Sequence, residues 1–215
     1  MVMKLMLGPG RTFVEAALLL RLDGRAGAPR LLGYGGERPM LLLEDEDAPL
    51  SLLLKVVELV AQRLREMHDL GVVHNDVAVP NVVVRVADDY QLLEARLAEF
   101  TLACPSGHSL GMDAEPAACP RVAPEVARGG ASTPAADVFS LGVLLQELSR
   151  VKADAQELPL QAKEAAQLAT EEEPQARPDL AVLEELLHEA VLWQKKKEKR
   201  KKNKKTRMQK AKMAH

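Results

Sequence analysis

Aromatic residues are scarce in this chain of 215 residues: one Trp, two Tyr and three Phe make up 3% of it. The hydrophobic fraction is nevertheless 47%, so a core has to be built from Leu, Val and Ala. A chain of this length and hydrophobic content can bury one substantial core or two small lobes. We therefore expect a globular protein of one or two lobes.

Cysteines and long apolar runs are also nearly absent. Only Cys104 and Cys119 occur. Neither has a CxxC partner or a nearby histidine cluster at zinc spacing, so we expect two reduced thiols rather than a disulfide. No apolar run approaches the ~18 residues needed to cross a bilayer, and the run 1–7 is too short for a signal peptide. These absences predict a protein of the cytoplasm or nucleus with no membrane span.

The charge of the chain is divided sharply between its body and its end. The formal net charge is −2, but residues 195–215 hold 12 of the 29 Lys and Arg residues and one of the 31 acidic residues. The body therefore carries about −13 and the end about +11. Three interpretations of the basic segment stay open: a nuclear or nucleolar address, a contact with nucleic acid or an acidic membrane, and a solvated helix extension. No aromatic residue follows Trp193, so a nucleic acid would be held by its phosphates.

The pattern of apolar residues predicts a small strand-rich first part. Apolar runs at 2–7, 31–34 and 39–43 are bounded by glycine or proline and predict strands. A capped helix is expected between the first two runs. The acidic run 44–47 then interrupts the pattern.

After residue 50 the pattern becomes mainly helical. Apolar residues recur at the spacing of an amphipathic helix, and a later stretch is apolar nearly all round, as a buried helix is. The last helix continues toward the lysine-rich end without a stop signal. The expected elements are a helix at 50–70, strands at 82–84 and 95–97 around a turn at 87–89, a loop at 104–122, and helices at 137–150, about 157–170 and 178–194.

The segment 71–81 contains the most informative spacing in the chain. His74 is followed two residues later by Asp76, and Asn81 comes five residues after that aspartate. An apolar run at 82–84 follows at once. Taken alone, this spacing is also compatible with a plain turn between a helix and a strand.

Further segments follow in an order that resembles protein kinases. The resemblance covers about residues 2–190 and rests on the order of several motifs rather than on one. The segment 74–81 is similar to the catalytic loop H-R-D-L-x-x-x-x-N, 98–103 to A-D-F-G-L-A, 123–125 to A-P-E, and 137–143 to D-V-W-S-F-G-V. The resemblance implies an α+β, protein-kinase-like bilobal fold, with a truncated β-rich N-lobe at 1–45, a mainly helical C-lobe at 46–194 and a basic tail at 195–215.

The resemblance assigns roles to the residues of the central loop. Asp76 corresponds to the catalytic base, which accepts the proton of the substrate hydroxyl and orients that hydroxyl for in-line attack. Asn81 corresponds to a magnesium ligand, and His74 to a packing residue that braces the loop. Asn75 stands where the family has an arginine that neutralises an activation-loop phosphate, and Ala78 stands where it has a lysine for the γ-phosphate. These two departures remove positive charge from the site.

The second metal-handling segment departs from the family pattern at two positions. Glu99 replaces the magnesium-binding aspartate, and Thr101 replaces the flexible glycine. Glutamate keeps the charge but places it one methylene further out, and magnesium demands near-ideal geometry at about 2.0–2.1 Å. Threonine restricts the backbone. Glu99 is therefore either a weakened metal ligand or a purely structural residue.

Three residues match scaffold positions of the family. The resemblance pairs Glu125 with Arg177, and it implies that Asp137 accepts hydrogen bonds from the backbone of the His74–Asp76 loop. A buried ion pair of this kind costs about 3–5 kcal/mol to break on one side. These residues bear on the fold and not on turnover.

The first part of the chain contributes two further candidates. Lys4 resembles the lysine that holds the α- and β-phosphates, and Glu15 the glutamate of the mobile helix. Lys4 is equally compatible with an ordinary N-terminal lysine. The residues before Lys4 leave no room for a glycine-rich loop, and 33–36 lies too late in the chain to replace it.

These features predict a catalytically impaired protein kinase, or pseudokinase, that acts on protein partners as a scaffold or regulator. The alternative is a weak or atypical ATP-dependent serine/threonine protein kinase using Asp76, Asn81 and Glu99. A third possibility is an alternative or incomplete product of a longer kinase-like protein. The expected cofactors are ATP and Mg²⁺, bound weakly or not at all, and nucleic acid is a candidate partner of the basic tail.

Overall fold

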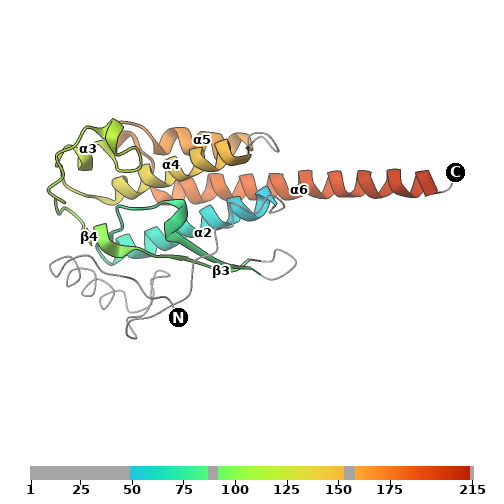
Figure 1. Cartoon of the computed structure of the whole chain (residues 1–215), viewed down its shortest axis with the longest axis horizontal. Helices are drawn as coiled ribbons and strands as arrows, with labels where there is room; N and C mark the ends of the chain where they lie inside the picture. The colour runs from blue at the N-terminus through green and yellow to red at the C-terminus, as the bar shows by residue number, and fades with distance from the viewer. Residues whose placement is uncertain (1–48, 87–91, 153–157, 214–215) are drawn as a thin grey trace.

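The computed structural model describes residues 49–86, 92–152 and 158–213. The predicted first lobe, with Lys4 and Glu15, and the turn at 87–89 lie outside the described residues. The described part is mainly helical and has two small antiparallel sheets. Figure 1 shows the long helices side by side, with a β-hairpin along one flank of the bundle.

Helix α2, Leu50–Asp69, leads into the segment that carries the His74 motif. Leu54, Leu64 and Met67 on this helix are fully buried, because its aliphatic residues recur at helical spacing. The helix ends where Gly71 adopts a φ of 70° and donates its N–H to the His68 carbonyl at 2.8 Å. Glycine takes this left-handed conformation without the steric cost that a Cβ brings. The bounds agree with the helix predicted over 50–70.

Three more long helices complete the bundle. They are α4, Pro134–Lys152, α5, Leu160–Ala169, and α6, Leu180–Met213. Helix α6 packs against α2 and α5, while α4 packs against α5 and α2. The core that they share is aliphatic, as the scarcity of aromatic residues predicts; among its fully buried side chains are Leu50, Leu54, Leu64, Leu141, Leu145, Leu183 and Leu187.

Helices α4 and α5 approach each other closely at Gly142. A Cβ at this position would lie 2.7 Å from the Cβ of Ala169 and 2.7 Å from the Cγ2 of Thr170. Glycine is therefore required by packing between the helices rather than by its own backbone conformation. The helix begins at Pro134, three residues before the predicted start at Asp137, because proline fits the first turn of a helix.

The strands are short and form two separate pairs. Strand β1, Val72–Val73, pairs antiparallel with β4, Cys104–Pro105. Strand β2, Val82–Val86, pairs antiparallel with β3, Leu92–Leu97, placing Val82 opposite Leu97. The second pair contains the strands predicted at 82–84 and 95–97 and is longer than predicted. The first pair was not predicted, and β4 lies at the start of the segment expected to be a loop.

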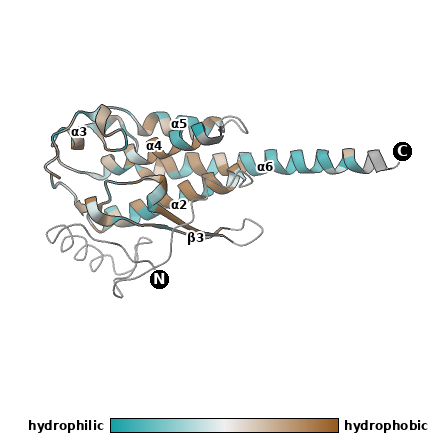
Figure 2. Ribbon diagram, in the orientation of Figure 1, coloured by the Kyte–Doolittle hydropathy of each residue, from teal (hydrophilic) through white to brown (hydrophobic). Residues whose placement is uncertain are grey.

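Helix α6 runs unbroken from the body into the basic segment. Its first half buries Leu183, Leu187 and Val191. No described residue after Gln194 is buried. Figure 2 shows the projecting part as almost uniformly hydrophilic. No helix within the described ranges is long and apolar enough to cross a membrane.

Candidate active site

The loop that carries His74, Asp76 and Asn81 is fixed at both ends by regular structure. Strand β1 enters it from α2, and a short 3-10 helix, Val79–Asn81, leads out of it into β2. Asn75 adopts a φ of 63°, a left-handed conformation that asparagine tolerates better than most residues. This turn lets the side chains of His74 and Asn75 bond to different parts of the chain.

The buried carboxylate of Asp137 holds the loop from helix α4. Its Oδ2 accepts the backbone N–H of His74 at 2.8 Å, and its Oδ1 accepts that of Asn75 at 2.7 Å. The Nε2 of His68, in the last turn of α2, donates to Oδ2 at 2.8 Å. Burial alone raises the pKa of the Asp137 carboxyl, but the hydrogen bond and electrostatic attraction of His68, together with the backbone hydrogen bond of His74, outweigh burial, and the pKa lies below its ordinary value. The carboxylate is therefore ionised at neutral pH.

His74 is fully buried and links the loop to the segment that contains Glu99. Its Nε2 donates to the carbonyl oxygen of Ala98 at 3.0 Å, and its Nδ1 accepts the N–H of Asp76 at 3.3 Å. Its ring also packs on Phe100, with 4.9 Å between the ring centroids. Burial lowers the pKa of His74, although the charges of Asp137 and Asp76 oppose that effect. A neutral imidazole with its proton on Nε2 satisfies both hydrogen bonds.

Asn75 is buried and joins two segments that follow much later in the chain. Its Nδ2 donates to the carbonyl oxygen of Leu102 at 3.1 Å and contacts the Sγ of Cys104 at 3.3 Å. Its Oδ1 accepts the hydroxyl proton of Ser132 at 2.6 Å. The kinase pattern has an arginine at this position, whose positive charge neutralises a phosphate. Here Asn75 instead cross-links two segments of the chain by hydrogen bonds.

Asp76 and Asn81 are brought together at the two ends of the turn. The Nδ2 of Asn81 donates to the backbone carbonyl oxygen of Asp76 at 2.8 Å. The backbone oxygen of Asn81 accepts the N–H of Ala98 at 2.8 Å. The Oδ1 of Asn81 is the amide atom with lone pairs for a metal, and the hydrogen bond of Nδ2 fixes the orientation of the amide. Asp76 itself is half-buried.

Glu99 follows Ala98, whose N–H is bonded to the backbone of Asn81, and it has an unusual backbone conformation. Its φ is 62° and its ψ 65°, a left-handed conformation that is rare for glutamate. Its side chain is exposed, whereas the next residue, Phe100, is buried. An amide oxygen and a carboxylate are donor types that magnesium accepts, and one or two carboxylates with nucleotide phosphates are its usual set. The donor chemistry of Asn81 and Glu99 therefore fits Mg²⁺, while the longer arm of Glu99 departs from the family pattern.

No group of three or more His, Cys, Asp or Glu side chains in the described ranges is arranged to hold a metal ion by itself. Lys4 and Glu15, the predicted ATP contacts, lie outside those ranges. Ala78 is described and its side chain is buried. The position that carries a γ-phosphate lysine in the family pattern thus offers only a methyl group here.

Arg177 forms a second buried anchor, apart from the loop. Its two terminal nitrogens donate to Glu125 at 2.7 and 2.8 Å. They also donate to the backbone oxygens of Ala135 and Glu172, and Nε donates to that of Glu171. All five N–H groups of the guanidinium are therefore used.

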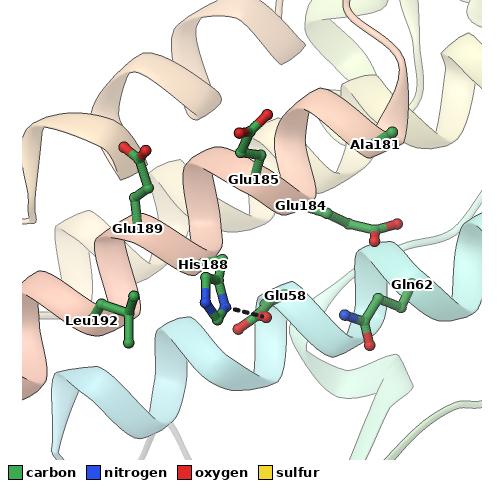
Figure 3. Close-up of a pocket in the computed structure, with 8 residues that line it drawn as sticks. All are labelled: Glu58, Gln62, Ala181, Glu184, Glu185, His188, Glu189 and Leu192. Carbon is green, nitrogen blue, oxygen red and sulfur yellow. Dashed lines mark hydrogen bonds and ion pairs between the residues drawn. The ribbon is translucent and has the colours of Figure 1, made fainter.

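A groove between α2 and α6 lies outside the candidate site. Figure 3 shows its lining, with the Oε1 of Glu58 accepting a hydrogen bond from the Nδ1 of His188 at 3.1 Å. The groove has a volume of about 570 Å³ and is bordered by several carboxylates, including Glu184, Glu185 and Glu189. None of the predicted site residues lines it. The candidate active site is therefore the loop, and the acidic groove is a separate feature.

The sequence did not single out His68 or Ser132, although both hold the loop. His68 was marked only by its place at the end of the helix that leads into the loop. Ser132 is 57 residues from Asn75, and no spacing rule connects the two. A partner of this kind becomes visible only once the chain is folded.

Replacing Glu125 with Ala should lower the free energy of unfolding by about 3 kcal/mol, because it leaves the buried guanidinium of Arg177 without its carboxylate. The measurement is urea unfolding followed by circular dichroism. The matched control is Glu172→Ala, which removes the exposed partner of Arg128 and should cost no more than about 1 kcal/mol. Equal effects of the two changes would contradict the assignment of Arg177 as a buried anchor.

The stability should depend on pH through His74. Its pKa in the folded chain lies below the value of about 6.5 in the unfolded chain. Below about pH 6.5 His74 therefore binds a proton in the unfolded chain but not in the folded chain. Its contribution to the free energy of unfolding is complete above that pH and is lost as the pH falls below it. The loss is at most about 1.4 kcal/mol per pH unit.

Urea unfolding at pH 7, 6 and 5 tests this dependence. His74→Gln should flatten the fall in stability over this interval, whereas His108→Gln, at an exposed position, should leave it unchanged. Asp137 contributes little to the interval, because its lowered pKa places its effect below about pH 4. An unchanged slope in His74→Gln would show that His74 is not buried as the neutral form.

Comparison with known proteins agrees with this geometry. A family model described as protein tyrosine and serine/threonine kinase matches residues 16–209. The chain is 34% identical over 114 residues to the serine/threonine-protein kinase drp72 of Corynebacterium efficiens, covering 53% of this chain and 21% of that protein. It is 33% identical over 114 residues to the serine/threonine-protein kinase PknL of Mycobacterium tuberculosis, covering 53% and 28%.

A mammalian protein shows a similar degree of likeness. The dual specificity testis-specific protein kinase 1 of Mus musculus is 36% identical over 132 residues, covering 58% of this chain and 21% of that protein. The chain thus matches between about a fifth and a third of the length of these relatives. The family match extends over most of the chain, from the region before α2 into the projecting part of α6. With the fold and the loop geometry, it shows that the chain belongs to the protein tyrosine and serine/threonine kinase family.

Proposed function

We propose that this chain is a catalytically impaired kinase-like domain that binds protein partners as a scaffold or regulator through its helical lobe. The observation that carries the proposal is a contrast between two sets of residues. Those that hold the fold, Asp137 and Arg177, have every expected hydrogen bond. Those that would handle phosphate and metal, at 78, 99 and 101, differ from the family pattern.

The backbone at Glu99 adds to this contrast. Glu99 has a left-handed backbone and an exposed side chain, and its carboxylate lies one methylene further from the backbone than that of the family's aspartate. Magnesium needs oxygen donors in near-ideal geometry at about 2.0–2.1 Å, so this longer side chain weakens the site. Asn75, used as an internal cross-link, supports the further proposal that phosphorylation of the loop 104–122 does not switch this protein.

A weak or atypical ATP-dependent serine/threonine kinase is the second candidate. It is favoured by the intact link between Asn81 and Asp76, and by the serine/threonine and dual-specificity names of the relatives. In such an enzyme the carboxylate of Asp76 would accept the proton of a substrate hydroxyl. Asn81 and Glu99 would hold magnesium, which when bound neutralises charge on the phosphates. Lys4 and Glu15 would contact the nucleotide.

Phosphate transfer from radiolabelled ATP to the chain itself and to a generic protein substrate separates the two candidates. The wild-type chain should give no more transfer than Asp76→Asn, because the phosphate- and metal-handling positions are altered. The double change Glu99→Asp/Thr101→Gly should raise transfer above wild type, since aspartate is shorter and tolerates a positive φ better than glutamate.

The matched control for the loss of charge is Asp113→Asn, at an exposed position outside the site. Wild-type transfer that disappears in Asp76→Asn and persists in Asp113→Asn would establish the enzyme and reject the impaired domain. Transfer that stays at background in the double variant would show that positions 99 and 101 do not account for the impairment.

We also propose that the protein is cytoplasmic or nuclear and that residues 195–215 act as a nuclear address. Dense lysine and arginine runs serve as such addresses. A fluorescent fusion of the full chain should lose nuclear signal when residues 195–215 are deleted. If the nuclear signal did not change after residues 195–215 were deleted, this role would be excluded.

A further inference from the structure

The part of α6 beyond Glu198 forms a straight arm that leaves the body of the protein. We call residues 199–213 the basic arm. Figure 1 shows it projecting past the ends of the other helices. At a rise of 1.5 Å per residue the arm is about 22 Å long. Every described side chain in it, from 199 to 209, is exposed.

The root of the arm is fixed to the body by Glu198. Its carboxylate accepts the backbone N–H of Ser51 at 3.1 Å and the hydroxyl of Ser51 at 2.6 Å. Ser51 lies in the first turn of α2, where N–H groups lack partners within the helix. Pro49, the residue before that helix, supplies no side-chain cap. Glu198 therefore caps α2 from another part of the chain and sets the point from which the arm leaves.

This anchor leaves the arm purely cationic. Glu198 is the one acidic residue of 195–215, and it lies before the arm. Between 199 and 209 no ion pair joins a described side chain to another described residue. By contrast, Arg96, Arg121 and Arg128 on the body are each paired with a glutamate. The seven cations of this stretch are Lys199, Arg200, Lys201, Lys202, Lys204, Lys205 and Arg207.

The distribution of these cations argues against a membrane as their target. A helix that lies in a membrane interface needs a broad apolar face opposite its charged face. Along 199–209 the only large apolar side chain is Met208, and cations occur on all sides of the helix. The arm therefore offers charge without a surface to insert.

Duplex DNA fits the arm in charge density and in width. Seven charges over the roughly 16 Å from 199 to 209 give one charge per about 2.4 Å, and duplex DNA carries one per about 1.7 Å. An α-helix with its side chains is about 10–12 Å across, which matches a major groove of about 12 Å. The deep, narrow major groove of an RNA duplex does not admit such a helix.

The length of the arm also keeps the DNA away from the acidic body. The body carries about −13 and would repel a polyanion at short range. The screening length at physiological ionic strength is about 8 Å, and the far end of the arm is about 22 Å from its root. We propose that the basic arm binds the phosphate backbone of double-stranded DNA without sequence preference, while the kinase-like body stays free for other partners.

Fluorescence anisotropy with the full chain and a labelled 20-base-pair duplex tests this proposal. Contact with about four phosphates gives a slope of about −3.6 for log affinity against log salt concentration, so affinity should fall about 100-fold between 50 and 200 mM salt. Two unrelated duplex sequences should bind equally, and a duplex RNA more weakly. Sequence-dependent binding, or tighter binding to RNA, would overturn the assignment.

Variants locate the binding. Lys201, Lys204 and Lys205 share one face of α6, and the triple change of these to Gln should leave about two contacts and reduce the 50-to-200 mM loss to about tenfold. The control Arg96→Gln/Arg121→Gln/Arg128→Gln removes the same charge from paired positions on the body and should leave affinity and slope unchanged. If both triple variants lowered the affinity for DNA equally, binding would depend on net charge alone. That result would reject the arm as the binding site.

Two further measurements test whether the arm binds a membrane or a second copy of the chain instead of DNA. Vesicles containing phosphatidylserine should bind the chain more weakly than the duplex does, and tighter vesicle binding would overturn the proposal. Mass photometry without DNA should show no assembly that depends on the arm. Assembly lost in the arm triple variant, with no duplex binding by wild type, would place the arm against the acidic groove of a second copy instead.

Discussion

The buried carboxylate of Asp137 is the constraint on which the rest of the described structure depends. It lies in α4, accepts two consecutive N–H groups of the loop, and meets His68 at the end of α2. One ionised side chain thus fixes two helices and a turn relative to one another. A charge buried in this way is stable only while its partners stay in place. The turn, the left-handed Asn75 and the direction of His74 all follow from keeping those partners in reach.

Arg177 applies the same principle at the start of α4, where it also donates to the backbone oxygen of Ala135. Its guanidinium is fully enclosed and uses all five N–H groups, two of them on Glu125. Such groups are costly to leave unpaired, so they specify one arrangement of the chain. The positions that would handle phosphate and metal differ from the family pattern, with a buried methyl group at Ala78 and an exposed glutamate at position 99. The described framework of the fold therefore does not depend on these two departures from the family pattern.

The sequence predicted what depends on local periodicity and on motif order. Helix α2 was predicted from its apolar spacing, and His74, Asp76 and Asn81 were placed in one loop by their spacing alone. The hydrogen bond between Asn75 and Ser132 was not predictable, because this contact depends on the packed fold and not on the separation of the two residues in the chain. The same holds for Glu198, which caps α2 through Ser51, 147 residues away in the chain. The two-residue pair of β1 and β4 is too short to leave a periodic signal.

We propose that this chain keeps the framework of the kinase fold and has lost nucleotide handling. The most direct test is thermal unfolding of the full chain in the presence of rising concentrations of ATP and magnesium. A ligand present at 100 times its dissociation constant stabilises a protein by about 2.7 kcal/mol. We predict an unfolding midpoint that does not change up to millimolar nucleotide. A saturable rise that requires magnesium and disappears in Asn81→Ala would contradict the account.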